Sequence, residues 1–248
     1  MPPVPDIRGV STMVTDGVTV SWTSRRTGSF ALETPDLAAR YREVTRGADV
    51  IFPRQVHGNV VIAANAAGGR SLLGSGWVAQ RTKADAVVSG PGGPAIAVIT
   101  ADCAPIAIWT LDCVIGVAHA GWRGLVAGVI EATVDAVRSR SVAPDSVRAA
   151  LGPCIGPCCY EFGSDDLSLV ARTYGDGIRS VTTDDTPALD MRAGVQSALE
   201  RSGCAFVQHL SAQGDASCTA CGSGWYSWRR YRDVGRQALI VQTTGAPA

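Results

Sequence analysis

The sequence predicts an α/β protein in which helices flank a central mixed β-sheet, within a single compact domain covering residues 1–248. Three observations support this class. The length of 248 residues suits one sizeable α/β domain. The middle of the chain holds consecutive apolar runs typical of buried strands, and a helix-period segment follows them directly.

The central strands are predicted by apolar runs that leave no polar face. Because buried strands are covered on both sides, they read as continuous apolar segments rather than as alternating ones. The runs are at residues 86–88, 95–100, 105–109 and 114–118. Further strands are expected at residues 18–22, 147–151 and 237–241.

Helices are predicted where apolar residues recur at helical spacing. The clearest helix spans residues 125–140, with basic residues gathered at its end. Two more are expected at residues 36–46, with Asp36 near the start, and at residues 190–202, with Asp190 as N-cap. Residues 71–82 have little periodicity and are expected to form a loop.

Charge and hydropathy narrow the class of protein. Basic and acidic residues are equal in number at 22 each, so no overall field favours nucleic acid. The longest apolar run contains Asp102 and Pro105 and is too short to span a bilayer. The first residues resemble no signal peptide, so we expect a cytoplasmic protein without a membrane partner. Thiols stay reduced in that compartment, and each of the eight cysteines is therefore core, ligand or nucleophile.

Three residues stand where strand-like segments meet small or polar residues: His57, Cys103 and His119. Glycines beside both histidines allow another group to approach closely. Two imidazoles and one thiolate suit zinc, and three protein ligands leave one tetrahedral position open, as in a catalytic site. Asp102, next to Cys103, is then a candidate for hydrogen bonding to a ligand or for proton transfer.

Two other interpretations of these residues stay open. A single histidine or cysteine in such a segment is more often a structural residue. Alternatively, Cys103 is a nucleophile activated by His57 or His119, with Asp102 as the orienting acid.

The remaining cysteines carry weaker signals. Cys218 and Cys221 have CxxC spacing, but no second pair with that spacing accompanies them, which disfavours a structural zinc knuckle. Cys154, Cys158 and Cys159 lie in a turn rich in glycine and proline, where core packing is the better interpretation.

Several motifs, in this order along most of the chain, resemble the YfiH or laccase-domain family. They are RQVHG at 54–58, KADA at 83–86, TADC at 100–103, HAGWRG at 119–124, GPCIG at 152–156 with CYE at 159–161, and CT at 218–219 with YSWRR at 226–230.

The resemblance implies a zinc-dependent enzyme with purine nucleoside phosphorylase and adenosine deaminase activity. It carries the metal ligands over to His57, Cys103 and His119. The family was first described as multicopper oxidases, but three histidines cannot supply several histidine-rich copper sites, so we expect Zn²⁺ rather than copper.

The expected partners are a nucleoside and phosphate, and the protein is expected to be a monomer. The predicted catalytic residues are Asp102, Cys103 and Arg123, where Arg123 supplies positive charge for phosphate. Gln55 and Arg229 are predicted to bind substrate. So are Arg25 and Arg26, although residues 24–28 depart from the family's usual arginine-histidine-glycine-glycine segment.

Two competing functions remain. Some members of the family are linked to peptidoglycan editing, and an amidase acting on UDP-MurNAc-L-Ser would use the same site. The other alternative is a non-catalytic partner protein in cell division or the cell wall.

Overall fold

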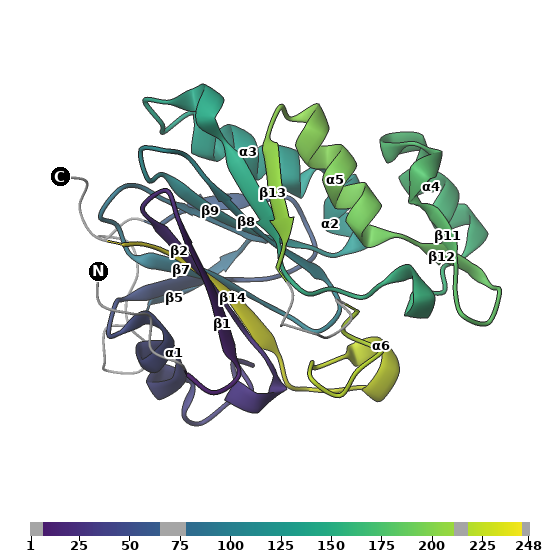
Figure 1. Cartoon of the computed structure of the whole chain (residues 1–248), viewed down its shortest axis with the longest axis horizontal. Helices are drawn as coiled ribbons and strands as arrows, with labels where there is room; N and C mark the ends of the chain where they lie inside the picture. Colours follow the sequence, from purple (N-terminus) through teal and green to yellow (C-terminus); the bar gives the residue numbers. More distant parts are fainter. Residues whose placement is uncertain (1–6, 65–77, 211–217, 245–248) are drawn as a thin grey trace.

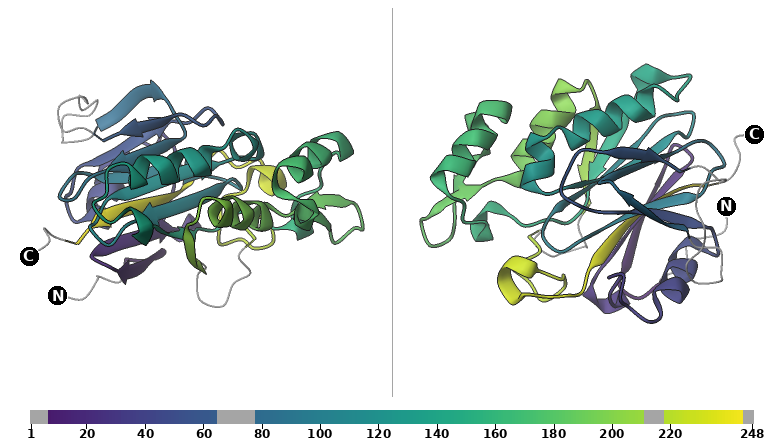
Figure 2. Two further views of the ribbon diagram at one scale, coloured as in Figure 1. Left: turned by 90° about the horizontal axis from the view of Figure 1, so that it is seen from above. Right: turned by 180° about the vertical axis from the view of Figure 1, so that it is seen from behind.

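The computed structural model describes residues 7–64, 78–210 and 218–244. In this part of the chain, two large β-sheets lie face to face, with α1 on the outer side of one sheet and a group of helices on the outer side of the other (Figures 1 and 2). The α/β class with mixed sheets is confirmed, and the strands are divided between these two sheets.

The first sheet contains antiparallel and parallel pairs, with the parallel pairs around β3. Its order is β1 (Val10–Thr15), β2 (Val18–Thr23), β14 (Gln237–Thr243), β7 (Ala95–Thr100), β3 (Val50–Arg54) and β5 (Val78–Lys83).

The second sheet is mixed as well, with parallel pairs at its two edges. Its order is β13 (Ala205–His209), β10 (Arg148–Leu151), β8 (Ala104–Trp109), β9 (Ile115–Ala120), β6 (Ala86–Ser89) and β4 (Val61–Ala63). A separate ribbon pairs β11 (Arg179–Val181) with β12 (Pro187–Leu189).

Alternation along the strands explains why the central runs are apolar throughout. In β8, Ile106 and Ile108 pack toward the helices, whereas Ala107 and Trp109 pack between the two sheets. Successive side chains point to opposite faces of a strand, so a strand covered on both faces needs apolar residues at every position.

The helices complete the outer layers. Tyr41 of α1 packs on the first sheet with Phe30 and Phe52, and α2, α3, α4 and α5 share the core on the outer face of the second sheet. The α-helices are α1 (Leu37–Thr45), α2 (Trp122–Val126), α3 (Val129–Arg138), α4 (Ser164–Tyr174), α5 (Met191–Arg201) and α6 (Trp228–Tyr231), and the short 3₁₀ helices are η1 (Arg25–Thr27), η2 (Pro144–Ser146), η3 (Pro157–Cys159) and η4 (Asp176–Ile178).

Two sequence expectations need correction. The helix expected at residues 125–140 is broken, because Gly128 has a left-handed φ of 84° between α2 and α3. Residues 78–82, expected in a loop, belong to β5, which pairs in parallel with β3; residues 71–77 lie outside the described part.

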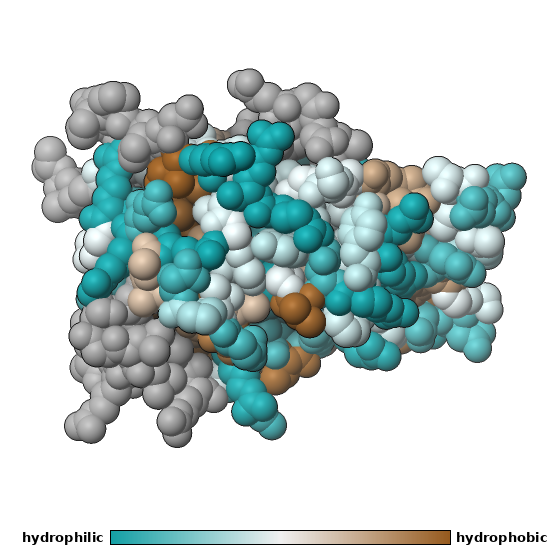
Figure 3. Space-filling model, turned by 90° about the horizontal axis from the view of Figure 1, so that it is seen from below, coloured by the Kyte–Doolittle hydropathy of each residue, from teal (hydrophilic) through white to brown (hydrophobic). Residues whose placement is uncertain are grey.

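Among the described residues, no helix has both the length and the apolar character needed to cross a bilayer. On the face seen in Figure 3, hydrophilic and neutral residues dominate and the hydrophobic ones are scattered.

Candidate metal centre and its pocket

The structure brings the three predicted metal ligands together. His57 follows β3 of the first sheet, Cys103 lies in the connection from β7 to β8, and His119 is on β9 of the second sheet. Their ligand atoms all lie within 4.8 Å of one another. The Cys103 Sγ and His57 Nε2 atoms are 3.8 Å apart, and the two imidazole rings are nearly perpendicular at 80°. The cluster therefore joins the two sheets where the C-terminal ends of β3, β7 and β9 come together.

Glycine at position 121 makes this close approach possible. A Cβ atom there would lie 2.6 Å from His57 Cδ2 and 3.3 Å from the Cys103 sulfur, so any larger residue would push the cluster apart. This agrees with the expectation that a glycine beside a histidine admits a close neighbour.

A carboxylate that sequence reasoning missed orients the centre. Asp85 is fully buried, and its Oδ1 atom lies 2.8 Å from His119 Nδ1. The same carboxylate accepts hydrogen bonds from the backbone N–H groups of Val56, His57 and Gly58. A carboxylate on one ring nitrogen fixes the imidazole and leaves Nε2 free for a metal. The available signal was an acidic residue directly before the apolar run at 86–88.

The electrostatics of the cluster favour a thiolate. Burial raises the pKa of Cys103, but the positive charge of His119 and hydrogen bonds from both histidines outweigh it and lower that pKa to about 6. For His119, burial lowers the pKa, and the Cys103 thiolate and Asp85 more than reverse this. Burial raises the pKa of Asp85 as well, but hydrogen bonds from His119 and the Gly58 backbone lower it overall. A thiolate is the form in which cysteine binds metals.

This donor set fits zinc. Two imidazole nitrogens and one thiolate are ligands that Zn²⁺ prefers, and three protein ligands leave a position for water or substrate. The carboxylate behind His119 is the usual support for a zinc-binding histidine.

The cluster opens into a cavity of about 500 Å³, which we call the ligand pocket. A pocket of this size accommodates a small molecule of nucleoside dimensions. Its lining residues are Leu32, Pro53, Arg54, Gln55, His57, Ile99, Thr100, Ala101, Cys103, His119, Trp228 and Arg236.

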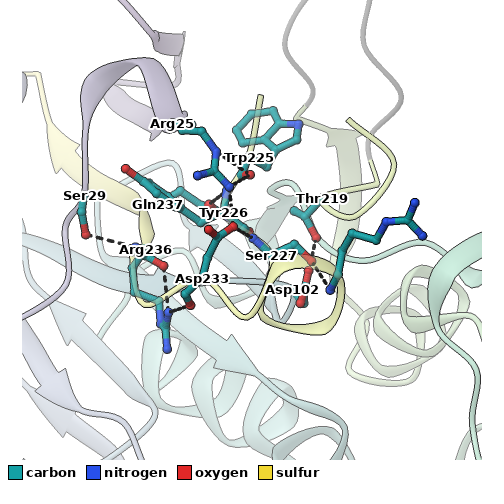
Figure 4. Close-up of polar contacts among 12 residues, drawn as sticks. Arg25, Ser29, Asp102, Thr219, Trp225, Tyr226, Ser227, Asp233, Arg236 and Gln237 are labelled. Carbon is teal, nitrogen blue, oxygen red and sulfur yellow. Dashed lines mark hydrogen bonds and ion pairs between the residues drawn. The ribbon is translucent and has the colours of Figure 1, made fainter. Parts of the chain in front are cut away.

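Of the predicted substrate-binding residues, only Gln55 lines this pocket. Its amide donates to the Ile99 carbonyl at 2.8 Å and accepts from the Ile99 N–H at 2.9 Å, which holds the side chain against β7. Arg25 instead donates to the Trp225 carbonyl and pairs with Asp233 (Figure 4). Arg26 is exposed and does not line the pocket.

The other predicted residues do not line the ligand pocket. Asp102 is buried, and its carboxylate accepts 2.6 Å hydrogen bonds from the Thr219 hydroxyl and the Arg229 backbone N–H (Figure 4). The Arg229 guanidinium donates to the Glu161 carbonyl. Arg123 is exposed and stacks on Trp122 at 4.4 Å.

The cations that do line the pocket are Arg54 and Arg236. Arg54 directly precedes Gln55 within the first recognised motif, so its place in the sequence was the available signal. Arg236 directly precedes β14, and its guanidinium donates to the Asp233 and Gly235 carbonyls. Trp228 of α6 adds an aromatic wall that is 48 % exposed, whereas Trp225 is buried in the core.

Comparisons with known proteins give the family. A sequence profile described as multi-copper polyphenol oxidoreductase laccase matches residues 8–244. The chain is 38% identical over 197 residues to a Streptomyces coelicolor protein named purine nucleoside phosphorylase, covering 78% of this chain and 75% of that one. A Streptomyces griseus protein with the same name is 35% identical over 195 residues, covering 78% and 74%.

Solved structures agree in fold. A Neisseria meningitidis protein superposes with a TM-score of 0.77 at 26% identity, over 96% of this chain and all of the other. A Bacillus licheniformis protein described as hypothetical protein YfiH gives a TM-score of 0.79 at 21% identity, over 96% and 97%. The chain belongs to the multi-copper polyphenol oxidoreductase laccase family, which is the laccase-domain or YfiH family that its motifs resemble.

Proposed function

We propose that this protein is a zinc-dependent purine nucleoside phosphorylase that also deaminates adenosine. One observation carries the proposal: the three zinc-type ligands of the centre open into a pocket that also contains two arginines. A metal next to two cations suits a substrate pair of which one member is an anion. The names of the Streptomyces relatives support the phosphorylase part of the proposal.

Different pocket residues have different roles in phosphorolysis. Arg54 and Arg236 bind the oxyanions of phosphate, and the exposed face of Trp228 stacks on the purine. A phosphate oxygen then forms a bond to C1′ of the ribose while the bond from C1′ to N9 breaks. The electron pair leaves with the purine, the proton of hydrogen phosphate ends on the departing base, and the products are ribose 1-phosphate and the free base.

Zinc, when bound, supplies a Lewis acid and lowers the pKa of water at the centre. The chain's own contribution is to hold the ligands in place. Asp85 keeps the proton on His119 Nδ1, and Gly121 leaves room for the His57 ring beside the Cys103 sulfur.

The test is product analysis by liquid chromatography and mass spectrometry. The zinc-loaded protein is incubated with adenosine, with and without inorganic phosphate. We expect adenine and ribose 1-phosphate only when phosphate is present, and inosine in both cases. The variant His119→Ala should lose both activities by more than about a thousandfold, because metal-based stabilisation is worth several kcal/mol.

A parallel incubation with UDP-MurNAc-L-Ser tests the amidase alternative. Release of L-serine without phosphorolysis or deamination of nucleosides would overturn the proposal. So would undiminished nucleoside turnover by His119→Ala.

A further inference from the structure

A second cluster of metal-type ligands lies outside the candidate centre. Cys158 and Cys159 belong to η3, and Cys218 and Cys221 belong to the segment that leads to α6. The four sulfur atoms all lie within 4.8 Å of one another. The CxxC pair thus has a partner pair after all, made of two adjacent cysteines some sixty residues earlier in the chain.

The backbone holds this four-cysteine cluster together. Cys154 and Cys218 form a parallel β-bridge, and the Thr219 N–H donates to the Cys154 carbonyl at 3.1 Å. The Gly156 N–H donates to the Cys218 sulfur at 3.1 Å. A hydrogen bond to sulfur is stronger when the sulfur is a thiolate, so this contact favours the ligand form.

The distances suit a tetrahedral metal site. The Cys221 sulfur lies 3.3 Å from that of Cys158 and 3.5 Å from that of Cys159. Zinc–sulfur bonds of about 2.3 Å in a tetrahedron place sulfurs about 3.8 Å apart. A disulfide requires about 2.05 Å and joins only two of the four atoms, whereas Cys221 here approaches two neighbours at similar distances.

Four cysteine thiolates are a set of ligands that suits zinc. Soft thiolates prefer zinc to magnesium or calcium, and four protein ligands fill a tetrahedral zinc site completely. Such a closed site is structural, in contrast to the three-ligand centre.

Charged side chains of both signs lie next to the four-cysteine cluster. Zinc with four thiolates carries two net negative charges. Arg229 and Arg230 line the cavity of about 320 Å³ next to Cys158 and Cys159, and the same lining includes the acids Glu161 and Asp184. The four-cysteine cluster therefore lies at the surface, near both basic and acidic side chains.

We propose that the four-cysteine cluster binds a second, structural Zn²⁺ that anchors the segment carrying α6 to the turn at η3. This segment reaches the candidate centre through two contacts. Thr219, between the two CxxC cysteines, donates to Asp102, and so does the Arg229 N–H of α6. The second zinc therefore fixes the position of Trp228 on the ligand pocket.

Metal content gives the first test. Inductively coupled plasma mass spectrometry of the purified protein should find about two zinc ions per chain. Cys221→Ser and His119→Ala should each hold about one, and Cys204→Ala, which removes a buried thiol outside both clusters, should keep two. His119→Ala should keep the second zinc even if the proposed nucleoside activity is never found, so the two proposals fail separately.

Cobalt substitution gives a test that does not depend on the serine variant folding. The Cys103→Ala protein loaded with Co²⁺ should retain a strong sulfur-to-cobalt charge-transfer absorption, because four thiolates remain together. Its loss in that variant would overturn the proposal. A single zinc in the wild type that His119→Ala loses, iron in place of zinc, or a disulfide found by mass spectrometry of the alkylated chain would overturn it as well.

Discussion

The candidate centre and the four-cysteine cluster sit on either side of Asp102 and are supported in different ways. The centre mixes nitrogen and sulfur ligands, and a buried carboxylate, Asp85, holds one ligand from behind. The four-cysteine cluster has only sulfur ligands, and backbone N–H groups support it. One has three ligands and opens into the ligand pocket, whereas the other has four ligands, which are enough to fill a tetrahedral metal site.

The difference shows how the number of ligands, and the groups that hydrogen-bond to them, distinguish a catalytic metal site from a structural one. A charged carboxylate tunes the basicity of a ligand, which matters where chemistry takes place. Backbone hydrogen bonds fix a ligand's position without adding charge, which suffices for a structural ion. We expect changes near the centre to alter chemistry and changes near the four-cysteine cluster to alter the position of α6.

Thiol reactivity should separate the clusters most strongly. After removal of metal, iodoacetamide at pH 7 should label Cys103 faster than the exposed Cys221, by roughly 30- to 100-fold. Burial raises the pKa of Cys103 but His119 lowers it to about 6, so the thiolate predominates. Desolvation raises the pKa of Cys221 to about 11, so its reactive form is rare at that pH.

The labelling rates of the two cysteines should depend on pH in different ranges. Labelling of Cys103 should fall about tenfold per pH unit below pH 6, as its thiolate is protonated, while labelling of Cys221 should rise from pH 7 toward 11. Peptide mass mapping gives both rates, with Cys103→Ala as the control. Faster labelling of Cys221 at pH 7 would show that the two clusters do not differ as described.

Asp85→Asn should weaken zinc binding at the candidate centre and leave the four-cysteine cluster unaffected. Its single remaining carbonyl oxygen cannot serve His119 and three backbone donors, so zinc affinity there should fall by about 10- to 100-fold. Competition with a graded chelator measures this loss, and the second zinc should be unchanged. The matched control is Asp36→Asn, a half-exposed carboxylate paired with Arg40. Equal zinc retention by both variants would contradict the orienting role of Asp85.

Arg236→Gln should weaken the binding of phosphate. The KM for phosphate should rise about tenfold and the KM for adenosine should change little, because phosphate is the substrate that we propose Arg236 to bind. Arg230→Gln, which removes a cation beside the four-cysteine cluster, is the control and should leave the phosphate KM unchanged. Steady-state kinetics with each substrate varied in turn distinguishes the two variants.

Much of the fold followed from local patterns, and the failures have physical causes. The central strands were predictable because both of their faces are buried, which leaves an apolar run in the sequence. The strand β5 was not, because its pairing with β3 depends on a distant segment. The break at Gly128 was missed because a single glycine in a helical pattern does not reveal its φ.

The same limits apply to the candidate site. His57, Cys103 and His119 were identified by their motifs, and the structure brings them together. Arg25 and Arg229 were expected near substrate because of charge, yet neither lines the ligand pocket, and their guanidinium groups donate to backbone carbonyls outside its lining. The partner pair for Cys218 and Cys221 was missed because adjacent cysteines lack CxxC spacing, and only the fold brings them near.

Asp102 links the two clusters and should give the smallest but most informative effect. The sequence predicts proton transfer by this residue, whereas its contacts with Thr219 and Arg229 favour positioning of α6. In Asp102→Asn, the amide can keep both contacts, since its oxygen accepts from the Arg229 N–H and its nitrogen donates to the Thr219 hydroxyl. Asp102→Gly removes both contacts without backbone strain, because the native φ is 94°.

If Asp102 positions α6, Asp102→Asn should keep the rates of phosphorolysis and deamination within about threefold of the wild type. The substitution keeps both hydrogen bonds, so it should change the stability of the α6 position by less than about 1 kcal/mol. Asp102→Gly should then raise the KM for nucleoside about tenfold in both reactions, because Trp228 loses its fixed place. If both variants instead lose deamination selectively and keep phosphorolysis, Asp102 is the proton-transfer group. The coupling between the two clusters would then have to run through other contacts of the α6 segment.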